Sequence, residues 1–162
     1  FCFGDRVGTP CPCANNGSPG NGCANSAHPG GANLSASGTP SLALDTLVLT
    51  ATDIHASSLQ LFIQGNAEIP PLSYGDGLRC ISGNLIRMFR IKNQHVTTVS
   101  APSAYSLPPS PATISGVSAA HGDVLTPGSV RGYQVYYRDP DPPFCPTQTF
   151  NVTNAVRVTW GT

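Results

Sequence analysis

The sequence predicts an all-β domain, a β-sandwich of the jelly-roll or immunoglobulin-like kind that is stapled by disulfides. Short β-branched and apolar stretches recur at a spacing of roughly ten residues, as they do in sandwiches. The 162 residues include 17 glycines and 16 prolines, which mark turns and disfavour long helices. Six cysteines, an even number, predict bridges. This length is enough for one domain with its own core.

Residues 1–40 are expected to form a disulfide-linked head rich in Gly, Pro and Asn, as part of the same domain. Its turn signals follow one another: Asn16-Gly17, Pro19-Gly20, Asn21-Gly22 and Pro29-Gly30. Residues 41–162 are expected to form the β-sandwich.

Strands are expected where apolar residues alternate, and where a short run is apolar or rich in β-branched residues. These segments are 41–50, 59–64, 84–92, 95–100, 112–118, 130–139 and 150–160. The last segment is expected to split into a hairpin at Asn154-Ala155. The only helix-like stretch is 53–62, and its Ser and His content makes it a weak helix former.

Charge is sparse, because only 10% of residues are charged, with eight basic and eight acidic side chains. A basic patch able to neutralise several phosphates cannot be assembled, so nucleic acid is excluded as a partner. No polybasic or amphipathic segment and no apolar run of membrane-spanning length is present, so membrane insertion is not expected. A net charge near zero favours self-association.

The cysteine count also indicates an oxidising compartment. Because the chain begins without a signal peptide, we expect a mature chain after signal-peptide removal, secreted to the extracellular space or the cell surface.

The cysteines favour one set of pairings, since only two of them lie outside the head and each of these is next to a predicted strand. The expected bridges are Cys80–Cys145, Cys2–Cys11 and Cys13–Cys23. The alternative for the head is Cys2–Cys13 with Cys11–Cys23. Zinc binding by the four head cysteines is disfavoured, because Cys-Pro-Cys does not match the C-x₂₋₄-C pairs of zinc ribbons.

No catalytic constellation stands out. Ser118, His121 and Asp123 are close in sequence, but a catalytic triad needs groups that converge from separate elements beside an oxyanion hole. The histidines form no metal-binding motif; they are His28, His55, His95 and His121. The sequence therefore predicts a protein that is not an enzyme.

Three aspartates are calcium candidates. Asp76 lies in "GDG", and Asp139 and Asp141 lie in "RDPDPP", so each is placed in a turn. Calcium prefers carboxylate and carbonyl oxygens from loops. The alternative explanation is that Asp favours turns because its side chain bonds the local backbone.

Two further kinds of candidate site are present, one for glycosylation and one for sugar binding. Asn-x-Ser/Thr sequons occur at Asn16, Asn33 and Asn151. Aromatic side chains could stack on sugars, although on alternating strands most should be core. They are Tyr74, Tyr105, Tyr133, Tyr136, Tyr137 and Trp160.

Four stretches, "FCFGD", "YGDGLRC", "YQVYYRDP" and "FNVTNAVRVTW", together with the spaced cysteines resemble an uncharacterised domain of secreted bacterial proteins. The resemblance covers nearly the whole chain. It implies secretion and a disulfide-linked all-β module, usually C-terminal in longer surface proteins. It implies no activity and no catalytic residue.

Two functions follow as hypotheses. The first is a secreted structural subunit that assembles with copies of itself into an extracellular filament, tube or surface layer, with Phe1 and Phe3 docking into a neighbouring subunit. The alternative is an extracellular carbohydrate-binding module, which requires solvent-facing aromatic side chains on a strand face.

Overall fold

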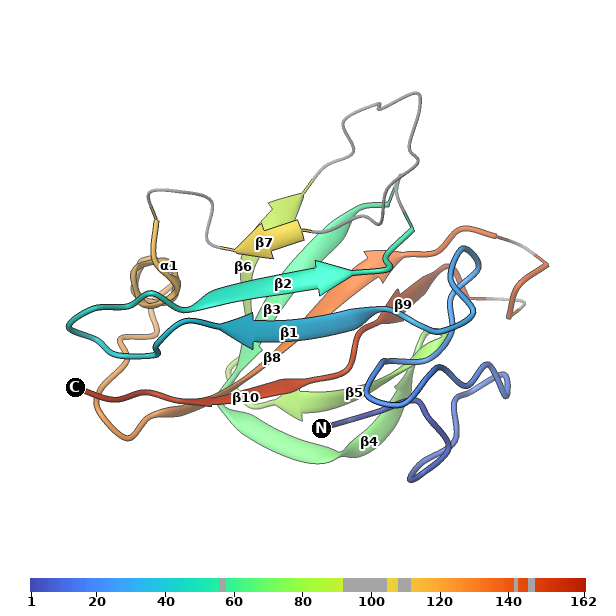
Figure 1. Ribbon diagram of the computed structural model, residues 1–162, viewed down its shortest axis with the longest axis horizontal. Helices are drawn as coiled ribbons and strands as arrows, with labels where there is room; N and C mark the ends of the chain where they lie inside the picture. Colours follow the sequence, from blue (N-terminus) through green and yellow to red (C-terminus); the bar gives the residue numbers. More distant parts are fainter. Residues whose placement is uncertain (56–57, 92–104, 108–111, 142, 146–147) are drawn as a thin grey trace.

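The computed structural model describes residues 1–55, 58–91, 105–107, 112–141, 143–145 and 148–162, with the backbone alone for 105–107. It is an all-β, sandwich-like fold stapled by three disulfides, so the predicted fold class is confirmed (Figure 1). Among the described residues, no helix is both long and apolar enough to span a membrane.

Two antiparallel sheets and a hairpin make up the fold. One sheet has the order β1-β2-β7, formed by β1 (Asn33–Ser37), β2 (Val48–Thr52) and β7 (Tyr105–Leu107). The other has the order β10-β8-β3-β6, with β9 also beside β8. Its strands are β3 (Gln60–Gly65), β6 (Ile86–Ile91), β8 (Val130–Arg138), β9 (Phe150–Val152) and β10 (Val156–Thr159). The hairpin is formed by β4 (Ala67–Tyr74) and β5 (Gly77–Ser82).

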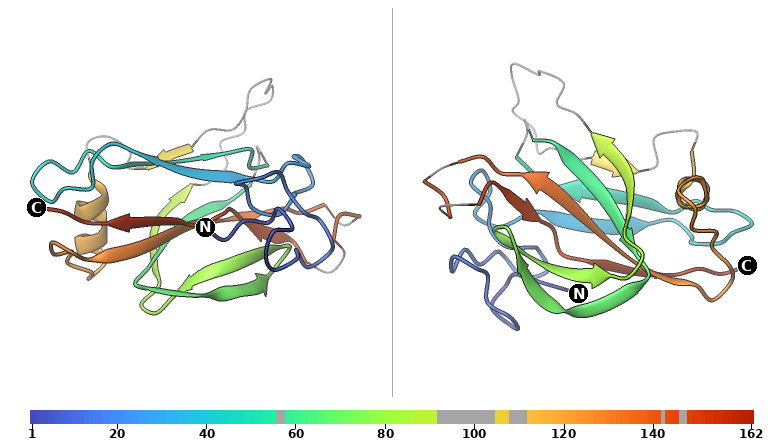
Figure 2. Two further views of the ribbon diagram at one scale, coloured as in Figure 1. Left: turned by 60° about the horizontal axis from the view of Figure 1, so that its bottom comes forward. Right: turned by 180° about the vertical axis from the view of Figure 1, so that it is seen from behind.

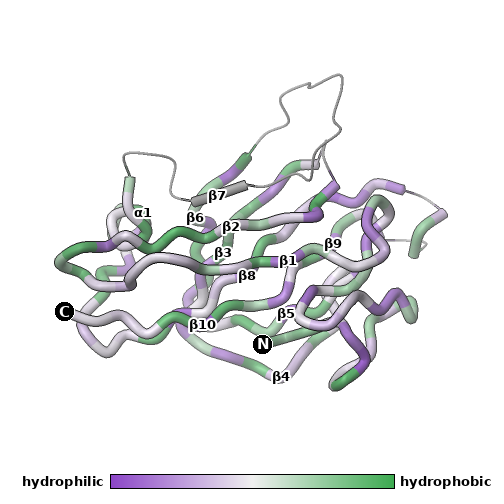
Figure 3. The backbone as a smooth tube through the Cα atoms, viewed as in Figure 1, coloured by the Kyte–Doolittle hydropathy of each residue, from purple (hydrophilic) through white to green (hydrophobic). Residues whose placement is uncertain are grey.

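The main core lies between the two sheets. Along β8, Tyr133, Val135 and Tyr137 are buried on the inner face. They pack with Phe62 from β3 and Leu49 from β2 in one apolar cluster. Figure 3 shows hydrophobic residues recurring along the strands of both sheets. The period of two in β3 and β8 therefore decides which side chains enter the core.

The outer face of the five-stranded sheet is only partly covered. At one end the β4–β5 hairpin and the head lie against it, as both views in Figure 2 show. Leu78 and Ile81 from β5 form a second apolar cluster there with Ala155 and four cysteines. Beneath them, the Gln134 side chain accepts a hydrogen bond from the Cys80 nitrogen and donates to the Leu78 carbonyl. At the other end of this face, the described residues leave a hollow over β3, β6 and β8.

The segment 112–118, predicted as a strand, is instead helical. Helix α1 (Ile114–Ala120) begins after Thr113, whose side chain accepts a hydrogen bond from the Gly116 nitrogen at 3.1 Å. An N-cap threonine outweighs the β-branched residues that suggested a strand. In contrast, the end of the weakly helix-like stretch 53–62 belongs to β3, which begins at Gln60. The predicted strand 95–100 lies outside the described residues.

The hairpin predicted at Asn154-Ala155 is wrong. Both β9 and β10 pair with the same edge of β8, with Val152 opposite Tyr136 and Val156 opposite Tyr133. Between these two pairs, residues 153–155 lie opposite only two residues of β8, Gln134 and Val135. Such an excess of residues on one strand is a β-bulge. The bulge turns the Asn154 side chain toward β1, where it accepts from the Leu34 nitrogen at 2.7 Å and donates to the Leu34 carbonyl at 2.9 Å.

All three favoured disulfide pairings are wrong. The bridges are Cys2–Cys80, Cys11–Cys23 and Cys13–Cys145. Only Cys11–Cys23 appears in the alternative pairing, and Cys80 and Cys145 each bond to the head instead of to each other. Since all six cysteines are bridged, no zinc-binding thiolate cluster remains in the head.

The pairing follows from how the head lies on the sandwich. The Ala155 nitrogen donates to the Phe1 carbonyl at 2.9 Å, which places Cys2 over β5. The Asn15 amide donates to the Asp76 carbonyl at 2.8 Å, which brings Cys13 toward the loop after β8. The end of the predicted head, residues 33–37, is itself a strand of the sandwich.

Candidate functional site

The open end of the outer face carries two rows of side chains across neighbouring strands. In one row Arg90, Leu61 and Tyr136 are directly opposite one another on β6, β3 and β8. In the next row Arg87 and Ile63 continue toward Gln134. The ladder shifts between Phe62 and Ile63, so Met88 has no partner on β3. This bulge lets two arginines three positions apart line the same face.

Three aromatic rings meet at one side of these rows. Tyr74 comes from the end of β4 and Phe150 from the start of β9, and their ring centroids are 4.9 Å apart. Tyr136 lies 5.1 Å from Phe150 and 6.4 Å from Tyr74. All three rings are half-buried. The hairpin end fits closely because Gly75, at φ +61°, has no Cβ to collide with the Phe150 ring.

These residues enclose a groove of about 540 Å³. Its lining consists of Leu59, Leu61, Ile63, Tyr74, Arg87, Arg90, Tyr136 and Phe150. A second hollow of about 470 Å³ shares Ile63, Tyr74 and Arg87 with it and extends past Leu85 to His121. The two hollows therefore form one continuous surface along the sheet, which we call the aromatic groove.

The described lining of the aromatic groove contains arginines but no acidic side chain. Arg87 and Arg90 are exposed, and the Arg79 guanidinium lies 5.3 Å from the Tyr74 ring centroid. Among the described residues, the ion pairs are His28–Asp53, Arg131–Asp123 and Arg157–Glu68, and none involves a groove arginine. The Nε of Arg79 is buried without a hydrogen-bond partner in the described part of the chain. The groove is thus suited to an anionic ligand.

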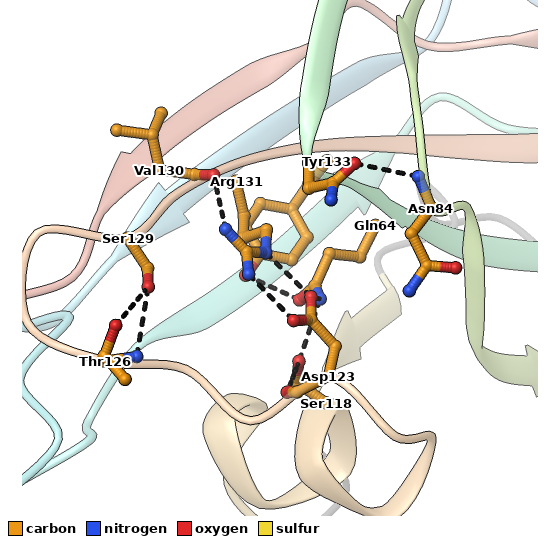
Figure 4. Close-up of polar contacts among 10 residues, drawn as sticks. Gln64, Asn84, Ser118, Asp123, Thr126, Ser129, Val130, Arg131 and Tyr133 are labelled. Carbon is orange, nitrogen blue, oxygen red and sulfur yellow. Dashed lines mark hydrogen bonds and ion pairs between the residues drawn. The ribbon is translucent and has the colours of Figure 1, made fainter.

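Ser118, His121 and Asp123 do not form a triad. The Ser118 hydroxyl is buried and donates to the Asp123 main-chain carbonyl at 2.7 Å (Figure 4). His121 is exposed at the end of α1. A proton-accepting imidazole therefore does not face the serine.

Asp123 instead belongs to a structural network that holds α1 to the sheet. Arg131 donates two hydrogen bonds to its carboxylate, at 2.7 and 2.8 Å, and these hold the pKa of Asp123 below its usual value. Gln64 donates to Ser118 and to Asp123, each at 2.8 Å, and accepts from the Tyr133 hydroxyl at 2.9 Å. Figure 4 shows these groups converging between the helix and β3.

The three calcium candidates do not form one ligand group. Asp139 is buried and accepts hydrogen bonds from the Ser26 nitrogen and hydroxyl, while Asp141 is half-buried. In the described ranges, the group of potential metal ligands that lie within 4.8 Å of one another joins Asp76 to Cys13 and Cys145, which are already bonded to each other.

Asp76 has an unusual environment. It is fully buried, and in the part of the chain that the structure describes neither carboxyl oxygen has a hydrogen-bond partner. Burial, and secondarily the charge of Asp139, raises the pKa of Asp76 to about 6.

The sequons occupy different environments. Asn151 is fully buried and its amide nitrogen donates to the Ala24 carbonyl at 2.8 Å, so the folded protein cannot be glycosylated there. Asn16 and Asn33 are half-buried, and their amide nitrogens donate to main-chain carbonyls at 3.0 and 3.2 Å.

Of the aromatic candidates, Tyr74 and Tyr136 line the groove, whereas the others with described side chains are core residues: Tyr133, Tyr137 and Trp160. The Tyr105 side chain and His95 lie outside the described residues. His28 lies 3.9 Å from Asp53 and away from the groove lining, and His55 is half-buried.

Phe1 and Phe3 differ in exposure. Phe1 is half-buried against its own chain, with its ring 5.3 Å from the Arg157 guanidinium. Phe3 is 40% exposed. Of the two predicted interface rings, Phe3 is therefore the one that faces solvent.

Sequence reasoning missed most of the groove: Leu59, Leu61, Ile63, Arg87, Arg90 and Phe150. The signal was present in "LQLFIQ", where Leu61 and Ile63 have the opposite parity to the buried Phe62. An apolar set on both faces of one strand indicates a second packing or binding surface.

The comparisons with known proteins give no match: no family model fits the sequence, and neither a curated protein nor a solved structure resembles it.

Proposed function

We propose that the protein is an extracellular carbohydrate-binding module whose aromatic groove takes an acidic polysaccharide. The observation that carries this proposal is one open groove that combines three clustered rings with two arginines, Arg87 and Arg90, that form no ion pair among the described residues. The three disulfides, which use every cysteine, support an oxidising compartment outside the cytosol. The resemblance to secreted bacterial domains is consistent with this location.

The two kinds of side chain have complementary roles. Tyr136 and Tyr74 offer ring faces to the C–H groups of a sugar, which is an apolar contact that tolerates water around the hydroxyls. Arg87 and Arg90 offer forked donors that match a carboxylate or a sulfate in bidentate fashion. Because the groove is open along its length, a chain can lie in it, which favours a polymer over an isolated monosaccharide.

The first test is calorimetric binding of the protein to polygalacturonate, with the neutral polymer dextran measured in parallel. We expect affinity for the acidic polymer that falls as salt is raised, because the arginines are exposed. Tyr136→Ala should lower the affinity at least about tenfold, equivalent to about 1.4 kcal/mol.

The paired variant Arg87→Ala/Arg90→Ala should remove the preference for the acidic polymer. Arg138→Ala is the matched control, because Arg138 is also exposed and on β8 but does not line the groove. If wild-type protein binds neither polymer, or if Arg138→Ala weakens binding as much as the paired variant, the proposal is wrong.

Self-assembly into a filament, tube or surface layer is the second candidate. It is favoured by two exposed apolar side chains of the head, Phe3 at 40% and Val7 at 88% exposure. Sizing and electron microscopy of concentrated protein test it. We expect polymers that Phe3→Ser disperses, and a monodisperse monomer at high concentration would exclude this role.

A further inference from the structure

The bridge between Cys13 and Cys145 differs from the other two in its exposure. Cys13 is exposed, whereas the remaining five cysteines are at most 9% exposed. Its partner Cys145 is 6% exposed and has φ +46°, a backbone conformation that is uncommon for a non-glycine residue. A dissolved thiol can therefore approach this bond from the Cys13 side.

A carboxyl group lies beside the buried half of this bond. One oxygen of Asp76 and the two sulfur atoms all lie within 4.8 Å of one another. Within the described residues, both Asp76 oxygens lack a hydrogen-bond partner, so no other group fixes the carboxyl proton. An unpaired buried carboxyl is costly, so its presence in a native structure calls for an explanation, and a redox role is one of them.

The surroundings of Asp76 favour its protonated form. Burial and the neighbouring Asp139 carboxylate raise its pKa to about 6. The other titratable group nearby is the Tyr137 phenol, whose oxygen accepts a hydrogen bond from Asn25. No cation pairs with Asp76 among the ion pairs of the described residues. The group can therefore release a proton in mildly acidic solution.

We propose that Cys13–Cys145 is a site of thiol–disulfide exchange in which Asp76 supplies the proton to the departing Cys145 sulfur. An external thiolate attacks Sγ of Cys13, a bond forms between the two sulfurs, and the bond between Cys13 and Cys145 breaks. The electron pair of that bond leaves on Cys145, which takes the proton from Asp76. The products are a mixed disulfide on Cys13, the thiol of Cys145 and the carboxylate of Asp76.

The reverse step restores the starting state. The Asp76 carboxylate accepts the proton of the Cys145 thiol, and the resulting thiolate attacks Cys13 and releases the external thiol. Exchange of this kind gives the protein a reversible covalent attachment point for thiol compounds. The site joins Cys13 of the head to the β4–β5 turn and the loop after β8. None of its three residues lines the aromatic groove, so the inference does not depend on the polysaccharide-binding role proposed there.

The experiment follows the opening of each bridge in wild-type protein exposed to reduced glutathione from pH 4.5 to 8. Samples are quenched by alkylation and analysed by peptide mapping. We expect Cys13–Cys145 to open at least about tenfold faster than Cys2–Cys80 or Cys11–Cys23, which act as internal controls. Glutathione should be found on Cys13.

The pH profile isolates the role of Asp76. Divided by the thiolate concentration of glutathione, the wild-type rate should fall as pH rises through about 6, where Asp76 loses its proton. Asp76→Asn should give a flat profile and, below that pH, a rate about tenfold lower. Asp5→Asn, which removes a carboxyl from the head itself, should retain the wild-type profile.

Three results would overturn the proposal. The first is that all three bridges open at similar rates, and the second is that glutathione is attached to Cys145. The third is a flat wild-type profile, which requires no variant and so stands even if Asp76→Asn does not fold. Because no polysaccharide is present, none of these outcomes bears on the function proposed for the groove.

Discussion

The carboxyl of Asp76 is buried beside Asp139, and its pKa is raised from 3.8 to about 6. The folded state therefore binds this proton more tightly than the unfolded state does. The associated stability is fully present below the unfolded pKa and is lost as pH rises through about 6. The contribution of Asp76 to the stability of the folded state is thus smaller above neutral pH than in mild acid.

Asp76→Asn is expected to remove this pH dependence, because the amide is neutral at every pH. At pH 8 the variant should be more stable than wild type by about 1–3 kcal/mol, and at pH 4 the two should be similar. Urea denaturation at both pH values measures the difference. An equal or lower stability of the variant at pH 8 would show that Asp76 is not destabilised when charged.

At the scale of single residues, the sequence predicted some features correctly and contained no information on others. The composition indicated bridges, and all six cysteines are bridged. In contrast, Asn151 has a sequon but is buried, because a three-residue motif contains no information on burial. Asp76 and Asp139 are far apart in the sequence, and it is the fold that brings them close enough for the charge of Asp139 to raise the pKa of Asp76.

At the scale of elements, the bulge between β9 and β10 joins the two sheets through one side chain. Asn154 is 4% exposed and satisfies both the nitrogen and the carbonyl of Leu34 on β1. In the order β1-β2-β7, β1 lies at the edge of its sheet and, among the described strands, pairs with a strand on one side only. Asn154 of the five-stranded sheet supplies the hydrogen bonds of Leu34 on the other side. The Asn154 side chain thus takes the place of main-chain hydrogen bonds on this side of Leu34.

Asn154→Ala should therefore destabilise the fold by about 2–4 kcal/mol, since it leaves two buried main-chain groups unpaired. Asn16→Ala is the control, because Asn16 also bonds the backbone but within the half-buried head; its cost should be under about 1 kcal/mol. Chemical denaturation of both variants gives the comparison. A similar loss of stability in the two variants would mean that the hydrogen bonds between Asn154 and Leu34 contribute little.

A strand with a clear period of two, such as β8, could be predicted from its alternation, and β3 was predicted from its short apolar run. The β4–β5 hairpin was missed, because Pro70 and Pro71 argue against a strand. The structure accommodates them in β4, whose pairing with β5 is irregular between Glu68 and Leu72. Helix α1 was missed because its seven residues are too few to show a helical period.

At the scale of the whole molecule, two bridges tie the head to the sandwich and one closes the head on itself. Cys13–Cys145 spans 132 residues of sequence and Cys2–Cys80 spans 78, whereas Cys11–Cys23 spans 12. In the chain-entropy description, a bridge restricts the unfolded chain more when it closes a longer loop.

Removing the long bridge should therefore cost more than removing the short one. Cys13→Ser/Cys145→Ser is expected to lower the free energy of unfolding by about 5 kcal/mol, and Cys11→Ser/Cys23→Ser by about 3 kcal/mol. Thermal and urea unfolding of the two variants test the order. The opposite order would indicate that local packing in the head outweighs loop closure.

The aromatic groove and the bridge pattern share a reason for being unpredictable. Each depends on which distant segments lie side by side, and the sequence alone carries no such distance. Phe150, Tyr74 and Tyr136 come from three strands, and their meeting is set by the approach of the hairpin end to β9. Period and composition predict the layers of the fold, whereas the contacts between layers follow from the packing.

The bridge from Cys13 to Cys145 also determines how the protein responds to mechanical load. A pull applied through the two ends passes across this covalent link, so only the short stretches before Cys13 and after Cys145 can lengthen. Most of the strands lie between the two cysteines and remain shielded from the force. While the bridge is closed, the domain behaves as a nearly inextensible connector. When a thiol opens it, the strands after Cys80 can extend, whereas residues 3–79 are still bypassed by the Cys2–Cys80 bridge.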